Sequence, residues 1–255
     1  MIQLKSPREI DIMAEGGRIL AETIALVRER VQPGMSTLDL DRLAEDFIRS
    51  HDGALPAFKG LYGFPGTLCT SINEEIVHGI PSAKRVLREG DLLKVDLGVR
   101  FGGLYTDAAT TVAIGDVDST SRRLLEVTAL ALERGIAAAQ PGNQIGDIGA
   151  AVQAVVEEAG FSVVRDLVGH GVGYLPHEEK PQVPNYGKPK RGTTLRPGLT
   201  IAIEPMVNVG TYKTRTLPDR WTIVTQDGSR SAHFEHTVAV TERGPRILTR
   251  SNGHR

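Results

Sequence analysis

The sequence predicts a single α+β domain over residues 1–255, built from two related halves of about 1–115 and 116–255. In this fold a curved antiparallel sheet carries helices packed on its outer face. Two observations support the prediction: helical and strand periodicities follow one another in the same order twice, and short blocks of sequence recur 108 residues apart. A chain that is 40% hydrophobic and 24% charged can also bury a sizeable core at this length.

The first half opens with a clear helix signal. Ser6 and Glu9 form a capping box, and Pro7 occupies the first helical position, where its missing N–H costs nothing. The helix should end before Pro33, and a second helix is predicted over about 37–49. A strand, a glycine turn and a second strand should follow, at residues 91–98, 101–103 and 104–114.

The second half repeats this order of elements. Its helices are predicted over about 121–139 and 145–159, and its strands, with a longer connection, over 199–207 and 233–240. Three blocks recur at one offset: residues 32–34 at 140–142, 87–90 at 195–198, and 93–96 at 201–204. Thr111–Ile114 is echoed by Thr237–Val240. An internal duplication explains these matches better than two turn types that coincide by chance.

Charge and cysteine content exclude several classes of protein. Thirty basic and 31 acidic side chains give a formal charge of −1, which argues against binding to nucleic acid or a membrane surface. The single Cys69 excludes an intrachain disulfide framework and a cysteine-cluster zinc site. The sequence contains no run of 18 apolar residues and no signal-peptide pattern at its start, so we expect a cytoplasmic protein.

Carboxylates stand at corresponding places in the two halves. Asp96 and Glu204 match within the repeat, and Asp107 and Glu235 lie on the return strands. Asp96 and Asp107 are 11 residues apart, and an odd separation across a hairpin with an even loop puts both side chains on one face. Four converging carboxylates would repel one another, so the pattern predicts one or two divalent cations, with Mn, Fe, Co or Zn favoured if an imidazole joins them.

Histidines near glycines are the candidate nitrogen ligands and donors. His170 and His177 lie seven residues apart in a glycine-rich segment, which favours a functional role for both. His78 stands in an apolar turn, where a structural role is equally compatible with the sequence. His233 and His236 flank Glu235, and we expect both to point away from it. Cys69 is expected to be a buried apolar residue rather than a nucleophile, because no Cys–His signature accompanies it.

These residues together resemble the methionyl aminopeptidases of the pita-bread fold, over nearly the whole chain. The most specific stretches are residues 71–81, 94–98, 169–173, 203–206 and 234–237. The compact chain and the 31-residue spacing from Glu204 to Glu235 are similar to the type I form of the family. The resemblance implies a metal-dependent hydrolase that removes N-terminal methionine from nascent proteins and prefers a small second residue.

The resemblance also implies roles for individual side chains. Two metal ions would be held by Asp96, Asp107, His170, Glu204 and Glu235. His78 and His177 would contact the peptide, and Glu204 would also shuttle a proton. The methionine pocket would be built by Phe58, Leu61, Phe64, Cys69 and Trp221. The chain departs from the family pattern at four positions: Leu61, Pro176, Lys180 and His233, the last of which replaces a frequent Gln.

Two other functions remain as alternatives. A proline-specific peptidase of the same fold would normally carry a large additional N-terminal domain, whereas here the first half begins near residue 1. A non-catalytic binding protein would typically have lost metal ligands, and all five are present. The balanced charge is compatible with a monomer, and the nascent-chain substrates of the family make association with ribosomes an expectation.

Overall fold

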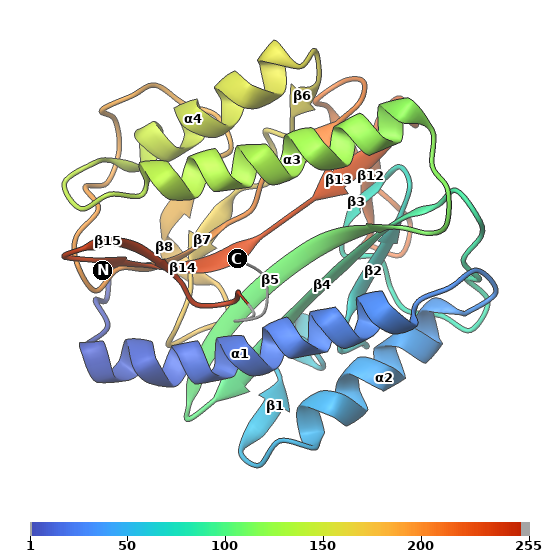
Figure 1. The fold of residues 1–255 in the computed structure, drawn as a ribbon, viewed down its shortest axis with the longest axis horizontal. Coiled ribbons are helices and arrows are strands. Elements are labelled where there is room, and N and C mark those ends of the chain that lie inside the picture. The colour runs from blue at the N-terminus through green and yellow to red at the C-terminus, as the bar shows by residue number, and fades with distance from the viewer. Residues whose placement is uncertain (1, 251–255) are drawn as a thin grey trace.

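The computed structural model describes residues 2–250, which form four α-helices around a set of short and long strands (Figure 1). The helices are α1 (Pro7–Arg30), α2 (Thr37–Arg49), α3 (Ser119–Ala138) and α4 (Ile145–Glu158), with a 3-10 turn η1 at Leu61–Gly63. The strands of the first half are β1 (Ala54–Pro56), β2 (Cys69–Ile72), β3 (Glu75–Val77), β4 (Leu92–Phe101) and β5 (Leu104–Ala113). Within these residues no helix is both long and apolar enough to cross a membrane.

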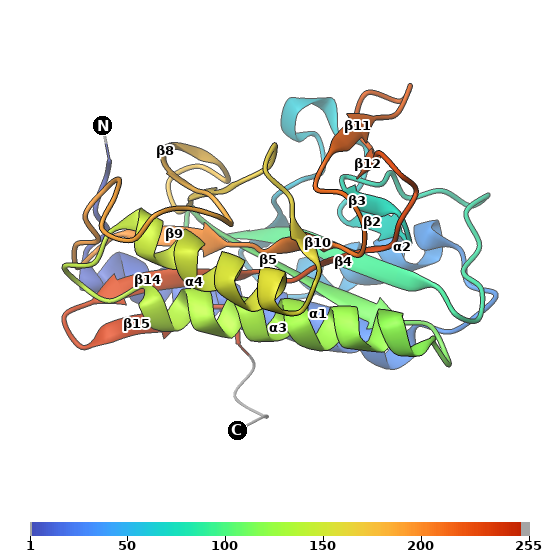
Figure 2. The same ribbon diagram turned by 90° about the horizontal axis from the view of Figure 1, so that it is seen from above.

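The second half contains more strands, and most of them are shorter. They are β6 (Ser162–Val163), β7 (Gly169–Gly171), β8 (Glu178–Val183), β9 (Thr200–Ile203), β10 (Met206–Asn208), β11 (Thr214–Thr216), β12 (Ile223–Thr225), β13 (Ser231–His233), β14 (His236–Thr241) and β15 (Gly244–Ile247). Figure 2 shows α1 and α3 on one side of the strands, with β8, β11 and β12 rising on the other. The helices therefore leave one face of the strand layer free for a site.

The first half is built on a continuous hairpin. β4 and β5 pair antiparallel over ten residues each, and β1 and β2 add to the other edge of β4. Apolar side chains of α1 and α2 pack against the hairpin in one core cluster that includes Leu20, Leu40, Val95 and Leu97, none of them measurably exposed. Burial of such side chains contributes about 1.5–3 kcal/mol each, which fixes the helices on this face.

The second half has the same plan with interrupted strands. Its main sheet runs in the order β15-β14-β9-β7-β8, and β10 and β13 continue the paths of β9 and β14 in a separate small sheet with β6. The predicted strands 199–207 and 233–240 are therefore each split in two. Pro205 explains the first break, because proline has no N–H to donate to a strand ladder.

Hydrogen bonds repeat between the halves at the offset found in the sequence. Gly34 donates its backbone N–H to Leu87 O, and Gly142 donates its own to Leu195 O, both at 2.9 Å. The isolated bridge between residues 36 and 86 recurs between 144 and 194. In the first half these contacts join the start of α2 to the segment that precedes β4. In the second half they join the start of α4 to the segment that precedes β9. The predicted duplicated α+β fold is confirmed, and all four predicted helices lie within two residues of their expected bounds.

Candidate active site

The four carboxylates lie on neighbouring strands at the centre of the molecule. Asp96 in β4 pairs with Ala109 of β5, and Asp107 pairs with Gly98, so the two aspartates are diagonal neighbours on one face. Glu204 follows the last residue of β9, and Glu235 precedes the first residue of β14. The structure therefore brings together acidic side chains that are up to 139 residues apart in the sequence.

His170 on β7 completes this cluster. Its Nε2 lies 3.5 Å from Glu204 Oε1 and 3.8 Å from Asp107 Oδ2. The Nδ1–H donates to the carbonyl oxygen of Gly171 at 2.9 Å, which leaves the Nε2 lone pair directed at the carboxylates. This is the arrangement that a metal-ligating imidazole needs.

Burial strongly perturbs the acidic groups of the cluster. It raises the pKa of Asp96 to about 7 and that of Glu204 to about 8. Burial and the neighbouring carboxylates raise the pKa values of Asp107 and Glu235 well above the ordinary range. Burial lowers the pKa of His170 to about 3, so its imidazole is neutral. Uncompensated negative charge is therefore costly at this place.

Several buried oxygens of the cluster have no hydrogen-bond partner among residues 2–250. They are Asp96 Oδ1, Asp107 Oδ1 and Glu235 Oε1. Ligand atoms also gather in three groups, each within 4.8 Å: Asp96, Asp107 and Glu235; His170, Glu204 and Glu235; and Asp107, His170 and His177. Oxygen-rich groups with one imidazole suit a divalent transition metal. The residues present therefore fit the cation that they were predicted to bind.

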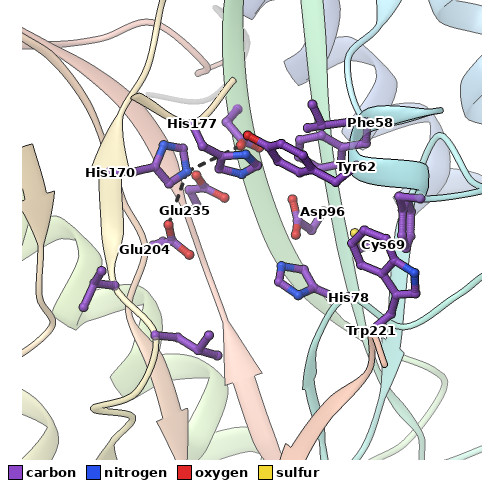
Figure 3. Close-up of a pocket in the computed structure, with 15 residues that line it drawn as sticks. Phe58, Tyr62, Cys69, His78, Asp96, His170, His177, Glu204, Trp221 and Glu235 are labelled. Carbon is purple, nitrogen blue, oxygen red and sulfur yellow. Dashed lines mark ion pairs between the residues drawn. The ribbon is translucent and has the colours of Figure 1, made fainter. Parts of the chain in front are cut away.

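A pocket of about 260 Å³ opens beside the carboxylates (Figure 3). Every residue predicted for metal, peptide or methionine lines it, including Phe58, Leu61, Phe64, Cys69 and Trp221. Phe64 and Trp221 meet edge to face with ring centroids 5.1 Å apart. Burial raises the pKa of the Cys69 thiol well above its ordinary value, which agrees with an apolar role. The cavity thus has an apolar end of aromatic rings and a polar end of carboxylates.

His177 and His78 stand on opposite sides of this cavity. The His177 ring lies 4.5 Å from that of His170 and 6.2 Å from those of Phe58 and Tyr62. The His78 ring meets Trp221 edge to face at 6.5 Å. Burial lowers the pKa of both histidines, that of His78 to about 4. Both imidazoles are therefore neutral and can donate one N–H each to a bound peptide.

The turn that presents His78 depends on the glycine after it. His78 has a positive φ of 60°. A Cβ on Gly79 would lie 2.2 Å from the carbonyl oxygen of Thr70, so only glycine fits there. The Gly79 N–H donates to Ser71 Oγ at 3.0 Å and fixes the turn against β2. The backbone of this turn and the edge-to-face contact with Trp221 together set the position of His78.

The expectation for His233 is wrong. It lies two residues before Glu235, and residues i and i+2 of an extended chain share a face, so its side chain points into the site. His233 Nε2 lies 3.5 Å from Glu204 Oε2. His236 does point away, with Nδ1 2.9 Å from Thr249 Oγ1. A correct count of strand parity would have found His233 from the sequence.

Three lining residues were missed at the sequence level: Tyr62, Leu167 and Val168. Tyr62 follows Leu61 in η1 and is 75% exposed, so it forms the rim of the pocket. Its aromatic character next to Leu61 was the available signal. Leu167 and Val168 precede β7 in a short apolar run, which resembles any buried segment, so the sequence alone could not mark them.

Comparison with known proteins decides the family. Residues 11–242 match metallopeptidase family M24. Methionine aminopeptidase 1 of Bacillus subtilis is 50% identical over 250 residues, which cover 98% of this chain and 100% of that one. The methionine aminopeptidase of Clostridium acetobutylicum is also 50% identical, over 98% of this chain and 99% of its own.

The chain belongs to metallopeptidase family M24 and, within it, to the methionine aminopeptidases. The crystal structure of the methionine aminopeptidase from Thermotoga maritima superimposes with a TM-score of 0.96 at 45% identity, covering 98% of this chain and 100% of that one. The predicted family and pita-bread fold are thereby confirmed. As a family M24 metallopeptidase, the protein is a metal-dependent hydrolase.

More distant members share the fold alone. The prolidase of Pyrococcus horikoshii is 24% identical with a TM-score of 0.77, and this chain, matched over 98% of its length, covers only 64% of the prolidase. The prolidase chain thus contains a large part with no counterpart in the matched region. The 50% identity to methionine aminopeptidases along their length weighs against the proline-specific alternative.

Proposed function

We propose that this protein hydrolyses the first peptide bond of polypeptides that begin with methionine, prefers a small second residue, and uses two divalent metal ions. The observation that carries the proposal is the convergence of four carboxylates and His170 at the polar end of an aromatic-lined pocket. The full-length similarity to methionine aminopeptidases supports the same substrate. Four carboxylates with one imidazole suit Co, Mn, Fe or Zn as the divalent ions.

The proposed ligands divide naturally between two ions. Asp107 and Glu235 each belong to two of the three groups of ligand atoms, and so does His170. Asp96 shares no group with His170, so these two residues would hold different ions, with Asp107 and Glu235 available to both. When bound, the pair would supply a Lewis acid for the peptide carbonyl, a water acidic enough to ionise near neutral pH, and an anchor for a free α-amino group.

The apolar end of the pocket is proposed to hold the methionine side chain. Phe58 and Cys69 are buried there, and Phe64 and Trp221 meet edge to face. An unbranched thioether side chain fits irregular apolar cavities and makes favourable contacts between sulfur and aromatic rings. The four atoms of this side chain would occupy the aromatic end and thereby place the peptide bond beside the carboxylates.

Three side chains would act on the reacting peptide. Glu204 accepts a proton from the attacking water and delivers it to the leaving amine, so its carboxylate must be ionised when the water attacks. His177 and His78 donate their N–H groups to the carbonyl oxygen and to the backbone of the second residue. Each neutral imidazole offers one N–H, which can stabilise the negative charge that develops on the carbonyl oxygen.

A peptide-release assay tests the proposal. The chelated protein is reloaded with Mn, Co or Fe and given Met-Ala-Ser, Gly-Pro and N-formylated Met-Ala-Ser. We expect methionine release only from the free Met-Ala-Ser, and losses of about 100-fold or more in kcat for Glu204→Ala and His177→Ala. Cleavage of Gly-Pro alone, or full activity in the chelated protein, would overturn it.

The setting of the reaction is part of the same proposal. Nascent chains are the natural source of methionyl N-termini. We propose that the protein is a monomer that processes these chains in the cytoplasm and associates with ribosomes. Co-sedimentation with ribosomes and the mass of the protein in solution test these statements. A protein that forms a stable dimer, or that stays in the supernatant at low salt, would contradict them.

A further inference from the structure

His233 is fixed in place by an exchange of hydrogen bonds between the two halves. Thr111 Oγ1 accepts the backbone N–H of His233 at 2.9 Å and donates to its carbonyl oxygen at 2.8 Å. Thr237 Oγ1 does the same for Asp107, at 2.9 and 2.8 Å. Thr111 and Thr237 occupy equivalent positions in the two halves. Thr111 lies four residues after Asp107, to which Thr237 is hydrogen-bonded, and Thr237 lies four residues after His233, to which Thr111 is hydrogen-bonded. His233 therefore occupies in the second half the place of Asp107 in the first.

The imidazole of His233 is buried with its polar atoms unused. The residue is 1% exposed, and neither Nδ1 nor Nε2 has a hydrogen-bond partner in the part of the chain that the structure describes. Buried polar atoms rarely lack a hydrogen bond, so we expect the ring to form one in the active protein. Its closest acidic atoms are Glu204 Oε2 at 3.5 Å and Glu235 Oε2 at 3.9 Å, both from Nε2.

The two oxygens of Glu204 face different imidazoles. Oε1 lies 3.5 Å from His170 Nε2, whose lone pair is free, and Oε2 lies 3.5 Å from His233 Nε2. A lone pair on His233 Nε2 would point at two carboxylate oxygens and be repelled, whereas an N–H would be attracted to both. The geometry therefore favours a hydrogen on Nε2 in either charge state of the ring.

We propose that His233 is a positioning residue for Glu204, which donates Nε2–H to Oε2 and so keeps Oε1 directed toward His170 and the metal. The proposal rests on the metal centre proposed above and adds a residue to it. His233 belongs to none of the three groups that could hold an ion, which separates this role from that of a ligand. Hydrogen bonds to ligating carboxylates orient them, and losing one typically costs about 10- to 100-fold in metal affinity.

Metal titration of the chelated protein by calorimetry tests the role without using activity. His233→Leu removes the donor, and we expect Mn to bind about 10- to 100-fold more weakly. His233→Gln keeps an N–H donor of similar reach, and its affinity should stay within about threefold of the parent. His236→Gln is the matched control, because that side chain points away from the centre toward Thr249.

The variants distinguish three outcomes. Weak binding by the Leu variant alone supports positioning by an N–H. Equal weakening in the Leu and Gln variants would show that the imidazole lone pair itself binds metal and would overturn the proposal. Unchanged affinity in both would overturn it as well. If the parent protein binds no divalent metal, the proposed function fails, independently of His233.

A second measurement needs no variant and covers the case in which the Leu variant does not fold. Long-range ¹H–¹⁵N spectra of the zinc-loaded protein, with ¹⁵N-labelled histidine, report which ring nitrogen carries the hydrogen. We expect His233 to be protonated at Nε2 and His170 to be protonated at Nδ1. A His233 ring with hydrogen on Nδ1 alone would overturn the proposal.

Discussion

The two halves of the molecule follow one plan but treat their central strands differently. In the first half, β4 and β5 run unbroken for ten residues each, and Asp96 and Asp107 project from within them. In the second half, Glu204 lies between β9 and β10, and Glu235 between β13 and β14. The first half thus supplies its carboxylates from regular strands, and the second supplies them from breaks.

The difference shows how the two halves of a duplicated fold can position the residues of one site in different ways. Regular strands position short aspartate side chains rigidly, because each neighbouring residue is fixed by the ladder. The breaks leave Glu204 and Glu235 outside the paired strands, and the longer excursion after β10 carries Trp221 to the pocket. The second half also contributes both His170 and His177. Substitutions in each half can test whether both halves are necessary for activity, how the two are joined, and how much stability the buried charges of each half cost.

The largest effect should come from removing one carboxylate of either half. We expect Asp107→Ala and Glu235→Ala each to lower methionine release by about 1,000-fold or more, since metal ions supply several kcal/mol to the transition state and about 1.4 kcal/mol is tenfold. Both proteins should stay folded by circular dichroism, because each variant removes a buried acidic group without a hydrogen-bond partner on one of its oxygens. Full activity in one variant would mean that its half is dispensable.

A smaller effect should follow from breaking a buried ion pair between the halves. Lys5 Nζ lies 2.5 Å from Glu178 Oε1, next to His177, and the lysine side chain is fully buried. Lys5→Met leaves Glu178 without its partner, so we expect about 3 kcal/mol less stability and a lower kcat. Chemical denaturation and peptide release measure both.

Arg18→Ala is the matched control for this pair. Arg18 also contacts carboxylates, those of Glu15 and Glu22, but all three side chains are at least 39% exposed. Exposed pairs contribute about 0–1 kcal/mol, so this variant should leave stability and kcat nearly unchanged. If the two variants behaved alike, the contact between the N-terminal segment and the His177 loop would have no special role.

The sequence predicted the helices well because their signals are local. The capping box at Ser6 and the apolar periodicity depend only on neighbouring residues, and the structure contains this box and a second one at Ser36. The strand breaks in the second half were not predicted. Pro205 was a local signal for the first break, whereas at the second break the Glu235 N–H donates to Ala109 O, a contact far along the chain. Convergence of the carboxylates followed from the repeat, whereas the rim residue Tyr62 and the inward-pointing His233 required either coordinates or a stricter count of parity.

The pH dependence of stability should reveal the cost of this convergence once the metals are removed by chelation. Above pH 7, where an unfolded histidine of ordinary pKa is mostly neutral, the raised pKa values of Asp107, Glu204 and Glu235 mean that the folded state holds more protons than the unfolded state. Stability should therefore fall between pH 7 and 8, by about 1.4 kcal/mol per pH unit for each net proton.

The buried Lys94 of the first half has the opposite effect on the pH dependence of stability, so a variant at this position is a control. Burial lowers its pKa to about 7, so the folded state holds one proton fewer there above pH 7. Lys94→Met should accordingly steepen the fall. Added Mn should reverse it, because the metal competes with protons and binds more tightly as pH rises. A thermal midpoint in chelator that rises from pH 7 to pH 8 would contradict the burial of the carboxylates.

The smallest effect concerns a glycine that only the continuous first half requires. A Cβ on Gly98 of β4 would lie 2.8 Å from Ala57 Cβ and 3.0 Å from Phe58 Cε1, so the pocket wall would have to shift. The repeat mate of Gly98 is Met206, which packs in an apolar cluster instead. We expect Gly98→Ala to raise KM for Met-Ala-Ser by about tenfold, since overpacking costs about 1–3 kcal/mol, while Mn affinity stays unchanged. A weaker metal centre with an unaltered KM would instead place the strain on Asp96, two residues away, and would show that the regular hairpin serves the carboxylates rather than the substrate pocket.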